Sequence, residues 1–470
     1  MRTRAVWNSN VSEFARFLAR RTASFTASTR SAVELASSDG ELRLFIVAGE
    51  VSGDSIGARL MGSLKKLSPL PLRFSGIGGH MMSKQGLNSV FPMEDIAVMG
   101  IWELLPHLNQ FRVRLKQAVQ AAHSFRPHAI ITVDSKGFSF RFLKHLRDRS
   151  RKQRMCDALH FHYVAPSFWA WKGGEARLGG LSEFVDHLLC ILPFEAEVCR
   201  SNGLRATFVG HPTLEDVVEC EVKDATEGRW KVKVNAEKFR NDNGISSGSK
   251  VISLLPGSRL QEVTRMIPIF RNTMKELQDS FPDIITTILV APNQHVESFI
   301  SQAALDWPAS LILVPGGSPQ MKYNSFSASD VALCTSGTAA MELQLARLPC
   351  VVAYRAHLLT EWFIRYKAKV SYISLPNILL HSPVIPEALF HDCTPSILAM
   401  LLRRLILDES IRQKQMVGAE KVVELLRLPE RRMYSSSAQL DSTCGHFTPS
   451  MIAASTILFS TRTKDDDCKI

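Results

Sequence analysis

Short apolar runs alternate with helical patterns along most of the chain. The first run, at 42–48, ends in a glycine-rich turn that leads into a helical pattern over 56–67. The same unit recurs further on, with apolar runs at 129–133, 159–164, 251–255, 285–291 and 331–334. Strands that alternate with helices at this spacing predict parallel sheets covered by helices on both faces. The pattern therefore predicts an α/β fold of two Rossmann-like domains that face a cleft.

Three stretches interrupt this pattern and divide the chain. Residues 1–41 precede the first strand, 214–250 are polar and charged without a sustained apolar period, and 431–470 are rich in Ser and Thr. We expect the first to be a targeting segment, the second a linker and the third an atypical polar tail. The two domains then occupy 42–213 and 251–430, each of a typical domain size.

The composition is that of a globular protein. Hydrophobic residues make up 45% and charged residues 21%, which excludes a mostly disordered chain. The net charge of +11 suits an anionic membrane surface, phosphate-bearing substrates or another polyanion. Nine cysteines without a Cys-x-x-Cys pair indicate a reducing compartment rather than a disulfide framework or a zinc site. No apolar run, including the one at 449–459, is long enough to span a bilayer.

Residues 1–33 explain much of the positive charge. They are rich in Arg, Ser and Thr and nearly free of acids. Val11, Phe14 and Leu18 fall on one face of a helix. An Arg-rich, acid-poor amphipathic segment is typical of a transit peptide, and the dense arginines favour the mitochondrion over the chloroplast. A disordered basic tail is the alternative.

Two turns in the second domain have the features of a phosphate site. The first turn carries Gly257, Ser258 and Arg259. The second carries Ser336, Gly337 and Thr338. Each lies between a strand and a helix, where backbone N–H groups attract phosphate and an arginine can add a bidentate contact. Glu342, one turn into the second helix, could accept hydrogen bonds from a ribose diol. Together the turns favour nucleotide binding, although each alone could be an ordinary turn with a Ser or Thr helix cap.

Two strand ends in the first domain also carry acids. The turn after the first strand contains Glu50, Ser52 and Asp54, and it lacks the G-x-G-x-x-G pattern of a dinucleotide site. Its acids would repel a pyrophosphate, so we expect this turn on the acceptor side, with a capped helix start as the alternative. Asp134 ends an otherwise apolar strand, where it suits a general base or the N-cap of the next helix.

Other polar and basic positions are open to a plain structural interpretation. His160 and His162 alternate on one strand without a third metal ligand of suitable spacing, which favours buried histidines over a metal site. Two stretches, 101–116 and 362–369, mix aromatic or aliphatic residues with basic ones. Core helices with a solvated basic face account for both, and a membrane-surface patch is the alternative.

At this point the motifs resemble those of the lipid-A-disaccharide synthases. The strings IVAGEVSGDSIGARL, GIGGHMM, HYVAPSFWAW, FVGHP, SGTAAME and SYISLPNIL occur in order between about 42 and about 428. The resemblance implies a glycosyltransferase-B fold, with an acceptor domain followed by a UDP-sugar domain. It implies inverting transfer of 2,3-diacylglucosamine from UDP to the 6-hydroxyl of 2,3-diacylglucosamine 1-phosphate, without a cofactor or a required metal. The partners are then these two lipids and a membrane surface, with no nucleic acid.

The resemblance also implies roles for individual residues. Asp134 corresponds to the proposed base, and Arg259, the SGT turn with Glu342, Arg355 and Asn377 belong to the UDP-sugar side. The family has a second acid three residues after the first, where this chain has Gly137, so Asp134 is the candidate base of this string. A UDP-sugar epimerase of the same fold and a non-catalytic lipid- or nucleotide-binding protein are the alternatives.

Overall fold

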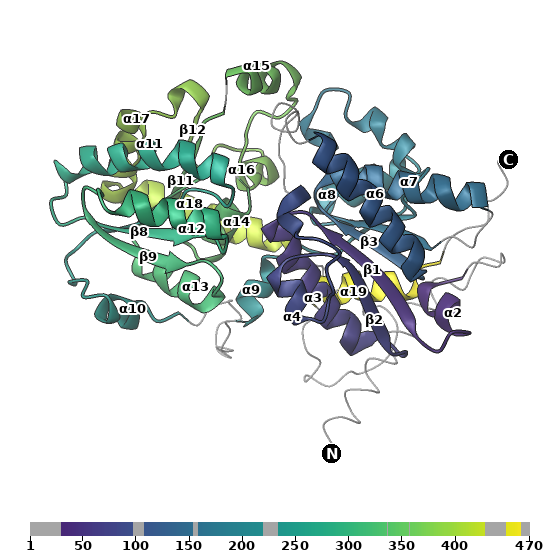
Figure 1. Ribbon diagram of the computed structural model, residues 1–470. Helices are drawn as coiled ribbons and strands as arrows, with labels where there is room; N and C mark the ends of the chain where they lie inside the picture. Colours follow the sequence, from purple (N-terminus) through teal and green to yellow (C-terminus); the bar gives the residue numbers. More distant parts are fainter. Residues whose placement is uncertain are drawn as a thin grey trace, which may run out of the picture. The chain divides into compact units, whose positions relative to one another are not determined.

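The computed structural model describes residues 30–96, 108–153, 158–219, 234–335, 337–356, 358–427 and 448–461. The chain divides into two compact units, each with one six-stranded parallel sheet (Figure 1). Unit 1 comprises 1–168, 173–212 and 428–470, and unit 2 comprises 169–172 and 213–427. The prediction of an α/β fold with parallel sheets is therefore confirmed. Within the described ranges, no helix has the length and apolar character needed to cross a bilayer.

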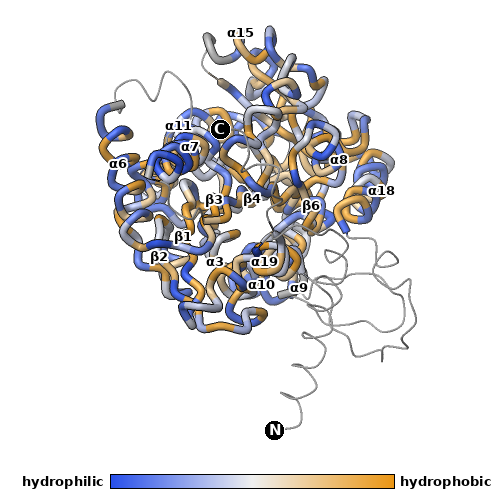
Figure 2. Tube along the Cα trace, turned by 90° about the vertical axis from the view of Figure 1, so that its right-hand side faces the viewer, coloured by the Kyte–Doolittle hydropathy of each residue, from blue (hydrophilic) through white to orange (hydrophobic). Residues whose placement is uncertain are grey.

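The sheet of unit 1 has the strand order β2-β1-β3-β4-β5-β6. The strands are β1 (Leu42–Ala48), β2 (Leu72–Ile77), β3 (Ala129–Val133), β4 (Leu159–Tyr163), β5 (His187–Cys190) and β6 (Ala206–Phe208). The main helices are α3 (Val51–Leu67), α4 (His80–Lys84), α6 (Leu108–Phe125), α7 (Lys136–Gln153) and α8 (Pro193–Ser201). Helices α6 and α7 lie on one face of the sheet and α3 on the other (Figures 1 and 2). Central strands such as β3 are buried along their whole length, which explains their continuous apolar sequence.

The sheet of unit 2 has the order β12-β11-β10-β7-β8-β9. The strands are β7 (Val251–Leu255), β8 (Ile285–Val290), β9 (Ser310–Pro315), β10 (Val331–Cys334), β11 (Cys350–Tyr354) and β12 (Glu387–Leu389). The helices are α11 (Leu260–Gln278), α12 (Gln294–Ala304), α13 (Pro319–Ala328), α14 (Thr338–Leu345), α15 (Leu358–Lys367), α16 (Leu375–Leu380), α17 (Pro395–Leu407) and α18 (Glu409–Leu426). Alternate residues of β10 enter two different cores, one formed with α11, α12 and α17 and one with α13 and α14.

The fold of unit 1 begins before its first strand. Helix α2 (Ala32–Ala36) starts with a capping box, in which Ser31 and Glu34 each bind the backbone N–H of the other. Ala32 and Ala36 are fully buried. Residues 1–29 lie outside the described residues, so only the end of the expected targeting segment can be described. That end, from Ser31 onward, is part of the folded unit.

The segments expected as a linker and as a polar tail also contain helices. Helices α9 (Leu214–Glu219) and α10 (Ala236–Asp242) lie in 214–250 and belong to unit 2. Helix α19 (Pro449–Phe459) packs on α3 and α2 in unit 1, where the hydroxyls of Ser63 and Ser450 lie 2.7 Å apart. Its small and apolar residues are buried because they face α3. The described part of the tail is therefore an apolar helix of the fold.

Candidate active site

The two predicted phosphate turns lie side by side in unit 2. Strands β7 and β10 are paired in parallel, with Leu255 opposite Cys334, so the turns that follow them share one edge of the sheet. Arg355 follows β11, the next strand, at the same edge. The structure thus brings together Gly257–Arg259, Gly337–Thr338 and Arg355. Ser336 lies outside the described residues.

Glu262 connects these two turns. Gly257 has φ of +113°, and a Cβ at this position would collide with the Glu262 carboxylate, so the turn requires glycine. This carboxylate accepts hydrogen bonds from the side chain of Thr335, in the second turn, and from the backbone N–H of Ser258, in the first. Burial raises the pKa of Glu262, and these bonds and Arg259 act in the opposite direction. Sequence analysis missed Glu262, although it follows the PGSR turn within the same motif.

The N-cap position of each helix that follows these turns holds neither Ser nor Thr. The N-cap residue of α11 is Arg259, whose side chain makes no cap bond, and that of α14 is Gly337, which has no side chain. Gly337 has φ of +106°, a conformation that glycine adopts without strain. Among the described residues, no Ser or Thr side chain caps the start of either helix. Helix N-termini of this kind favour an anion.

Glu342 is held by a buried lysine. Its carboxylate lies 2.9 Å from the Nζ atom of Lys322 in α13, and the same ammonium lies 3.0 Å from the carboxylate of Asp216 in α9. Burial alone would lower the pKa of Lys322, but the two carboxylates raise it above its ordinary value. The lysine therefore stays charged and fixes the orientation of Glu342. No spacing in the sequence predicts this triad, because its members come from three separate helices.

Two strand ends of unit 1 also lie side by side. Strands β1 and β3 are paired in parallel, which places the turn with Glu50 and Ser52 next to the turn with Asp134. A Cβ on Gly49 would lie 2.5 Å from the Ser135 hydroxyl oxygen, which shows how close the turns approach. Asp134 and Ser135 have φ of 51° and 46°, a left-handed conformation that is uncommon for non-glycine residues and concentrates at functional sites.

The comparisons with known proteins identify the family. The model of the lipid-A-disaccharide synthetase family matches residues 44–440. The chain belongs to the lipid-A-disaccharide synthase family. A "Probable lipid-A-disaccharide synthase, mitochondrial" of Arabidopsis thaliana is 60% identical over 440 residues, 93% of this chain and 95% of the relative. A lipid-A-disaccharide synthase of Rhodospirillum centenum is 40% identical over 385 residues, 82% of this chain and 90% of the relative.

Solved structures show the fold of this synthase family member. A UDP-GlcNAc 2-epimerase of Neisseria meningitidis, bound to UDP-GlcNAc, aligns with a TM-score of 0.53 and 12% identity, over 82% of this chain and 99% of that one. A putative UDP-N-acetylglucosamine 2-epimerase of Listeria monocytogenes aligns with a TM-score of 0.51 and 10% identity, over 82% and 95%. At this identity the likeness establishes the glycosyltransferase-B fold and not the epimerase reaction.

Two residues expected to contact substrate in this synthase family member have structural partners instead. Asp54 is buried, and its carboxylate accepts the backbone N–H groups of Gly79, Met81 and Met82 at 2.8, 2.9 and 3.0 Å. It therefore caps α4 and holds the glycine turn after β2. The alternative for this turn, a capped start of α3, is not seen at Glu50, whose side chain makes no cap bond there.

Asn377, in α16, is the second such residue. Its amide donates to the Ile385 carbonyl and to the Glu387 carboxylate, both at 2.8 Å, and accepts the Ile385 N–H at 2.9 Å. The side chain is fully buried. Its polar groups thus hold the segment that leads into β12, and the geometry gives it a structural role rather than the implied contact with UDP-sugar.

The strand histidines of the synthase chain are buried, as the sequence indicated. The Nδ1 atom of His160 lies 2.9 Å from the Phe184 carbonyl, and that of His162 lies 2.7 Å from the Thr132 hydroxyl. Burial lowers the pKa of His162 to about 3, so the ring is neutral at physiological pH. The described ranges hold no group of three potential metal ligands.

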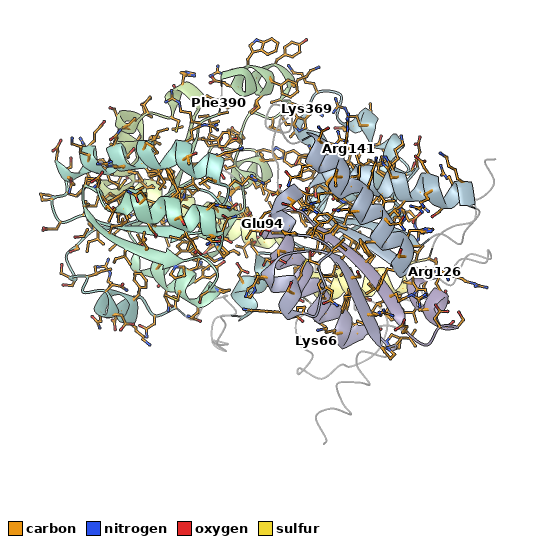
Figure 3. The ribbon with its side chains drawn as sticks, viewed as in Figure 1. Lys66, Glu94, Arg126, Arg141, Lys369 and Phe390 are labelled. Carbon is orange, nitrogen blue, oxygen red and sulfur yellow. The ribbon has the colours of Figure 1, made fainter. Side chains whose placement is uncertain are left out.

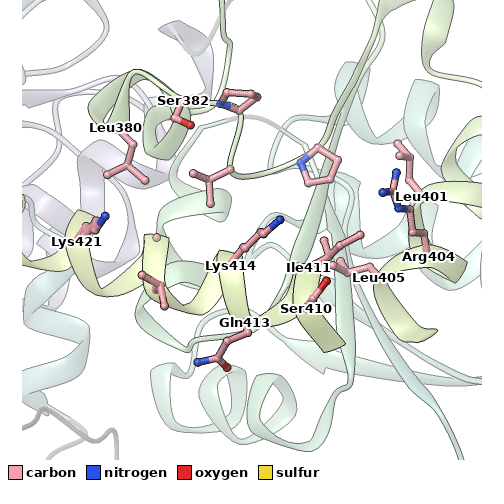
Figure 4. Close-up of a pocket in the computed structure, with 15 residues that line it drawn as sticks. Leu380, Ser382, Leu401, Arg404, Leu405, Ser410, Ile411, Gln413, Lys414 and Lys421 are labelled. Carbon is pink, nitrogen blue, oxygen red and sulfur yellow. The ribbon is translucent and has the colours of Figure 1, made fainter. Parts of the chain in front are cut away.

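A separate cavity of about 760 Å³ lies between α16, α17 and α18 (Figure 4). Basic side chains of Arg404, Lys414 and Lys421 line it together with apolar ones such as Leu380 and Ile411. Pro386, which precedes β12, also lines it, so it lies toward the amino end of that strand. None of the predicted site residues that the structure describes lines this cavity.

Proposed function

We propose that the protein transfers 2,3-diacylglucosamine from UDP to the 6-hydroxyl of 2,3-diacylglucosamine 1-phosphate. The products are lipid A disaccharide 1-phosphate and UDP. The observation that supports this most directly is the pair of adjacent turns after β7 and β10 in unit 2, tied together by Glu262, in a chain of this family. Turns that lead into helix N-termini and carry an arginine suit a diphosphate.

Unit 2 holds the UDP-sugar in this proposal. Arg259 and the N-termini of α11 and α14 stabilise the negative charge that grows on the diphosphate as the bond to the sugar breaks. Because these groups are fixed by the fold, they need little reorganisation during the reaction. Glu342, oriented by Lys322, accepts hydrogen bonds from the ribose, and Arg355 adds positive charge at the same sheet edge.

Unit 1 supplies the base. The oxygen of the 6-hydroxyl attacks C1 of the donor sugar, the bond between C1 and the UDP oxygen breaks, and UDP leaves with the electron pair. Asp134 takes the proton of the hydroxyl, and attack from the face opposite UDP inverts C1. Glu50 and Ser52, in the turn beside Asp134, contact the acceptor.

The protein acts in the mitochondrion in this proposal. The relative of Arabidopsis thaliana bears a mitochondrial name, and the N-terminal segment has the composition of a transit peptide. Because Ser31 and α2 belong to the folded unit, the targeting information lies before residue 31. Fusion of residues 1–29 to a reporter should direct it to mitochondria, and a cytosolic or chloroplast reporter contradicts this part. The acylated substrates make a membrane surface the expected partner, and no nucleic acid is involved.

One assay tests the reaction. The protein is incubated with UDP-diacylglucosamine, with and without diacylglucosamine 1-phosphate, and the products are separated by mass spectrometry. The proposal expects disaccharide and UDP only when both lipids are present. An epimerised UDP-sugar formed from the donor alone would indicate the epimerase reaction, and no turnover of either lipid would indicate a binding protein.

A further inference from the structure

Helix α15 displays large aromatic side chains to solvent. The side chains of Trp362, Phe363 and Tyr366 are 68%, 44% and 61% exposed. The rings of Trp362 and Tyr366, one turn apart, stack with centroids 5.9 Å apart and planes 4° apart. An exposed group of aromatic side chains of this size is unusual on a soluble surface and marks a site of interaction.

The surroundings of these rings are basic. Four basic residues belong to the same segments as the rings: Lys172, Arg365, Lys367 and Lys369. Lys369 lies near the end of α15 (Figure 3). Glu361 lies 3.0 Å from Arg365, so these two charges offset each other, and Asp392 lies 3.1 Å from His391. Lys172, Lys367 and Lys369 supply the remaining positive charge. The surface formed by α15, Trp169–Lys172 and Lys369 is therefore aromatic and positively charged, and we call it the α15 surface.

The α15 surface is fixed by backbone contacts within unit 2. Lys172 N–H donates to the Lys367 carbonyl at 2.9 Å, and Lys369 N–H donates to the Ala170 carbonyl at 2.8 Å. The ring of Trp171 lies 6.1 Å from that of Phe363. A segment distant in sequence thus holds the end of α15, so the aromatic side chains are presented on an ordered helix.

We propose that the α15 surface docks on an anionic lipid bilayer. Trp and Tyr rings prefer the headgroup region, where one part of the ring is apolar and the other hydrated, and basic side chains are attracted to anionic headgroups. A protein partner would not require this pairing of exposed aromatics with cations. The proposal gives a location to the membrane partner of the proposed function, but vesicle binding needs no turnover, so either can fail without the other.

Vesicle cosedimentation tests the proposal on the full chain. We expect the protein to bind vesicles of phosphatidylcholine with phosphatidylglycerol, and to bind vesicles of phosphatidylcholine alone much less. The double variant Trp362→Ser/Tyr366→Ser should lose about tenfold or more in affinity, in line with the large apolar area of two rings. Leu305→Ser is the matched control, because Leu305 is 78% exposed in unit 2 but lies outside the α15 surface. Its binding should not change.

Two further measurements place the contact. Lys367→Glu should weaken binding to anionic vesicles, and raised salt should weaken binding of the wild type in the same way. Brominated lipids should quench tryptophan fluorescence less in Trp362→Phe than in the wild type, while binding persists. The proposal is overturned if the folded double variant binds like the wild type, if Trp362→Phe is quenched equally, or if the double variant changes only the oligomeric state in gel filtration.

Discussion

Asp134 occupies a backbone conformation that narrows the choice of test variants. Its φ of 51° suits Asn as well as Asp, because both short polar side chains tolerate the left-handed region. Asp134→Asn should therefore leave stability nearly unchanged and remove the proton acceptor, with turnover lower by about a hundredfold or more. Thermal melting and turnover on one preparation check this.

Asp54→Asn is the matched control for that variant. The Asp54 carboxylate accepts three backbone N–H groups, and an amide can offer only one oxygen. This variant should lose stability, whereas Asp134→Asn should lose activity. Near-normal turnover of Asp134→Asn would remove Asp134 as the base.

Lys322 is the second residue with a sharp prediction. Lys322→Met removes the ammonium that lies against the buried carboxylate of Asp216 and the partly buried carboxylate of Glu342, so the free energy of unfolding should fall by about 3–5 kcal/mol. Lys250→Met is the control, because the side chains of the Lys250–Asp330 pair are 44% and 27% exposed and the pair should contribute less than about 1 kcal/mol. Urea unfolding measures both. An equal loss of unfolding free energy in the two variants would show that Lys322 stabilises the fold no more than an ordinary surface lysine.

At the scale of elements, β4 and β5 carry histidines that make unit 1 sensitive to acid. Burial lowers the pKa of His162 and of His187 to about 3 each, and Arg205 adds to the effect at His187. In the unfolded chain both rings take up a proton near their ordinary pKa, so falling pH favours the unfolded chain. The stability that depends on the neutral rings is therefore fully present above about pH 6.5 and is lost as pH falls toward 3. At pH 5 each histidine should have lowered the free energy of unfolding by about 2 kcal/mol relative to neutral pH.

Unfolding measured between pH 7 and pH 5 checks this prediction. His162→Gln should show a shallower loss of stability with falling pH than the wild type. His145→Gln is the control, because His145 is exposed on α7 and its removal should leave the slope unchanged. A wild-type slope in His162→Gln would show that other groups cause the sensitivity.

Helix α2 gives the second prediction at this scale. Ala36 is fully buried, so Ala36→Asp places an unpaired charge in the fold and should destabilise unit 1 by several kcal/mol, on the order of 3. Ser37→Asp, on the exposed next position, should be nearly neutral. Deletion of residues 1–29 should also be neutral, whereas deletion of 1–41 should not. Thermal unfolding of the four variants decides whether α2 belongs to the fold in solution.

At the scale of the whole molecule, the proposed function assigns binding of the UDP-sugar to unit 2 and the base to unit 1. Variants in the two units should therefore change UDP affinity and turnover differently. Arg259→Ala in unit 2 should weaken use of the UDP-sugar by about tenfold to a hundredfold, because a charge-assisted hydrogen bond contributes roughly 1.5–3 kcal/mol. UDP affinity should fall in this variant and persist in Asp134→Asn. Arg271→Ala, further along α11 and exposed, is the control. Calorimetric UDP binding and steady-state kinetics test the division, which fails if Arg259→Ala binds UDP normally.

Much of the fold could be predicted from hydropathy alone. The strands that the apolar pattern indicated are all interior strands, because burial on both faces leaves a continuous apolar run. Six strands were not predicted. Four of them, β2, β6, β9 and β12, are edge strands, where one side meets solvent and the apolar run is less continuous, and two, β5 and β11, are interior strands. Helices α2 and α19 were not predicted either. They are short, and their small residues are buried only by tertiary packing, α19 against α3 and α2 against α19 and β1.

The sequence by itself determined the parallel α/β sheets, the turns at their strand ends and the family, because these depend on local order along the chain. Only the tertiary structure decided what those turns contact. It joined the two turns through Glu262, bound Glu342 to Lys322 and Asp216, and gave Asp54 and Asn377 structural partners. The physical reason is that a polar side chain takes its role from the groups it meets, and packing brings those groups from distant parts of the chain.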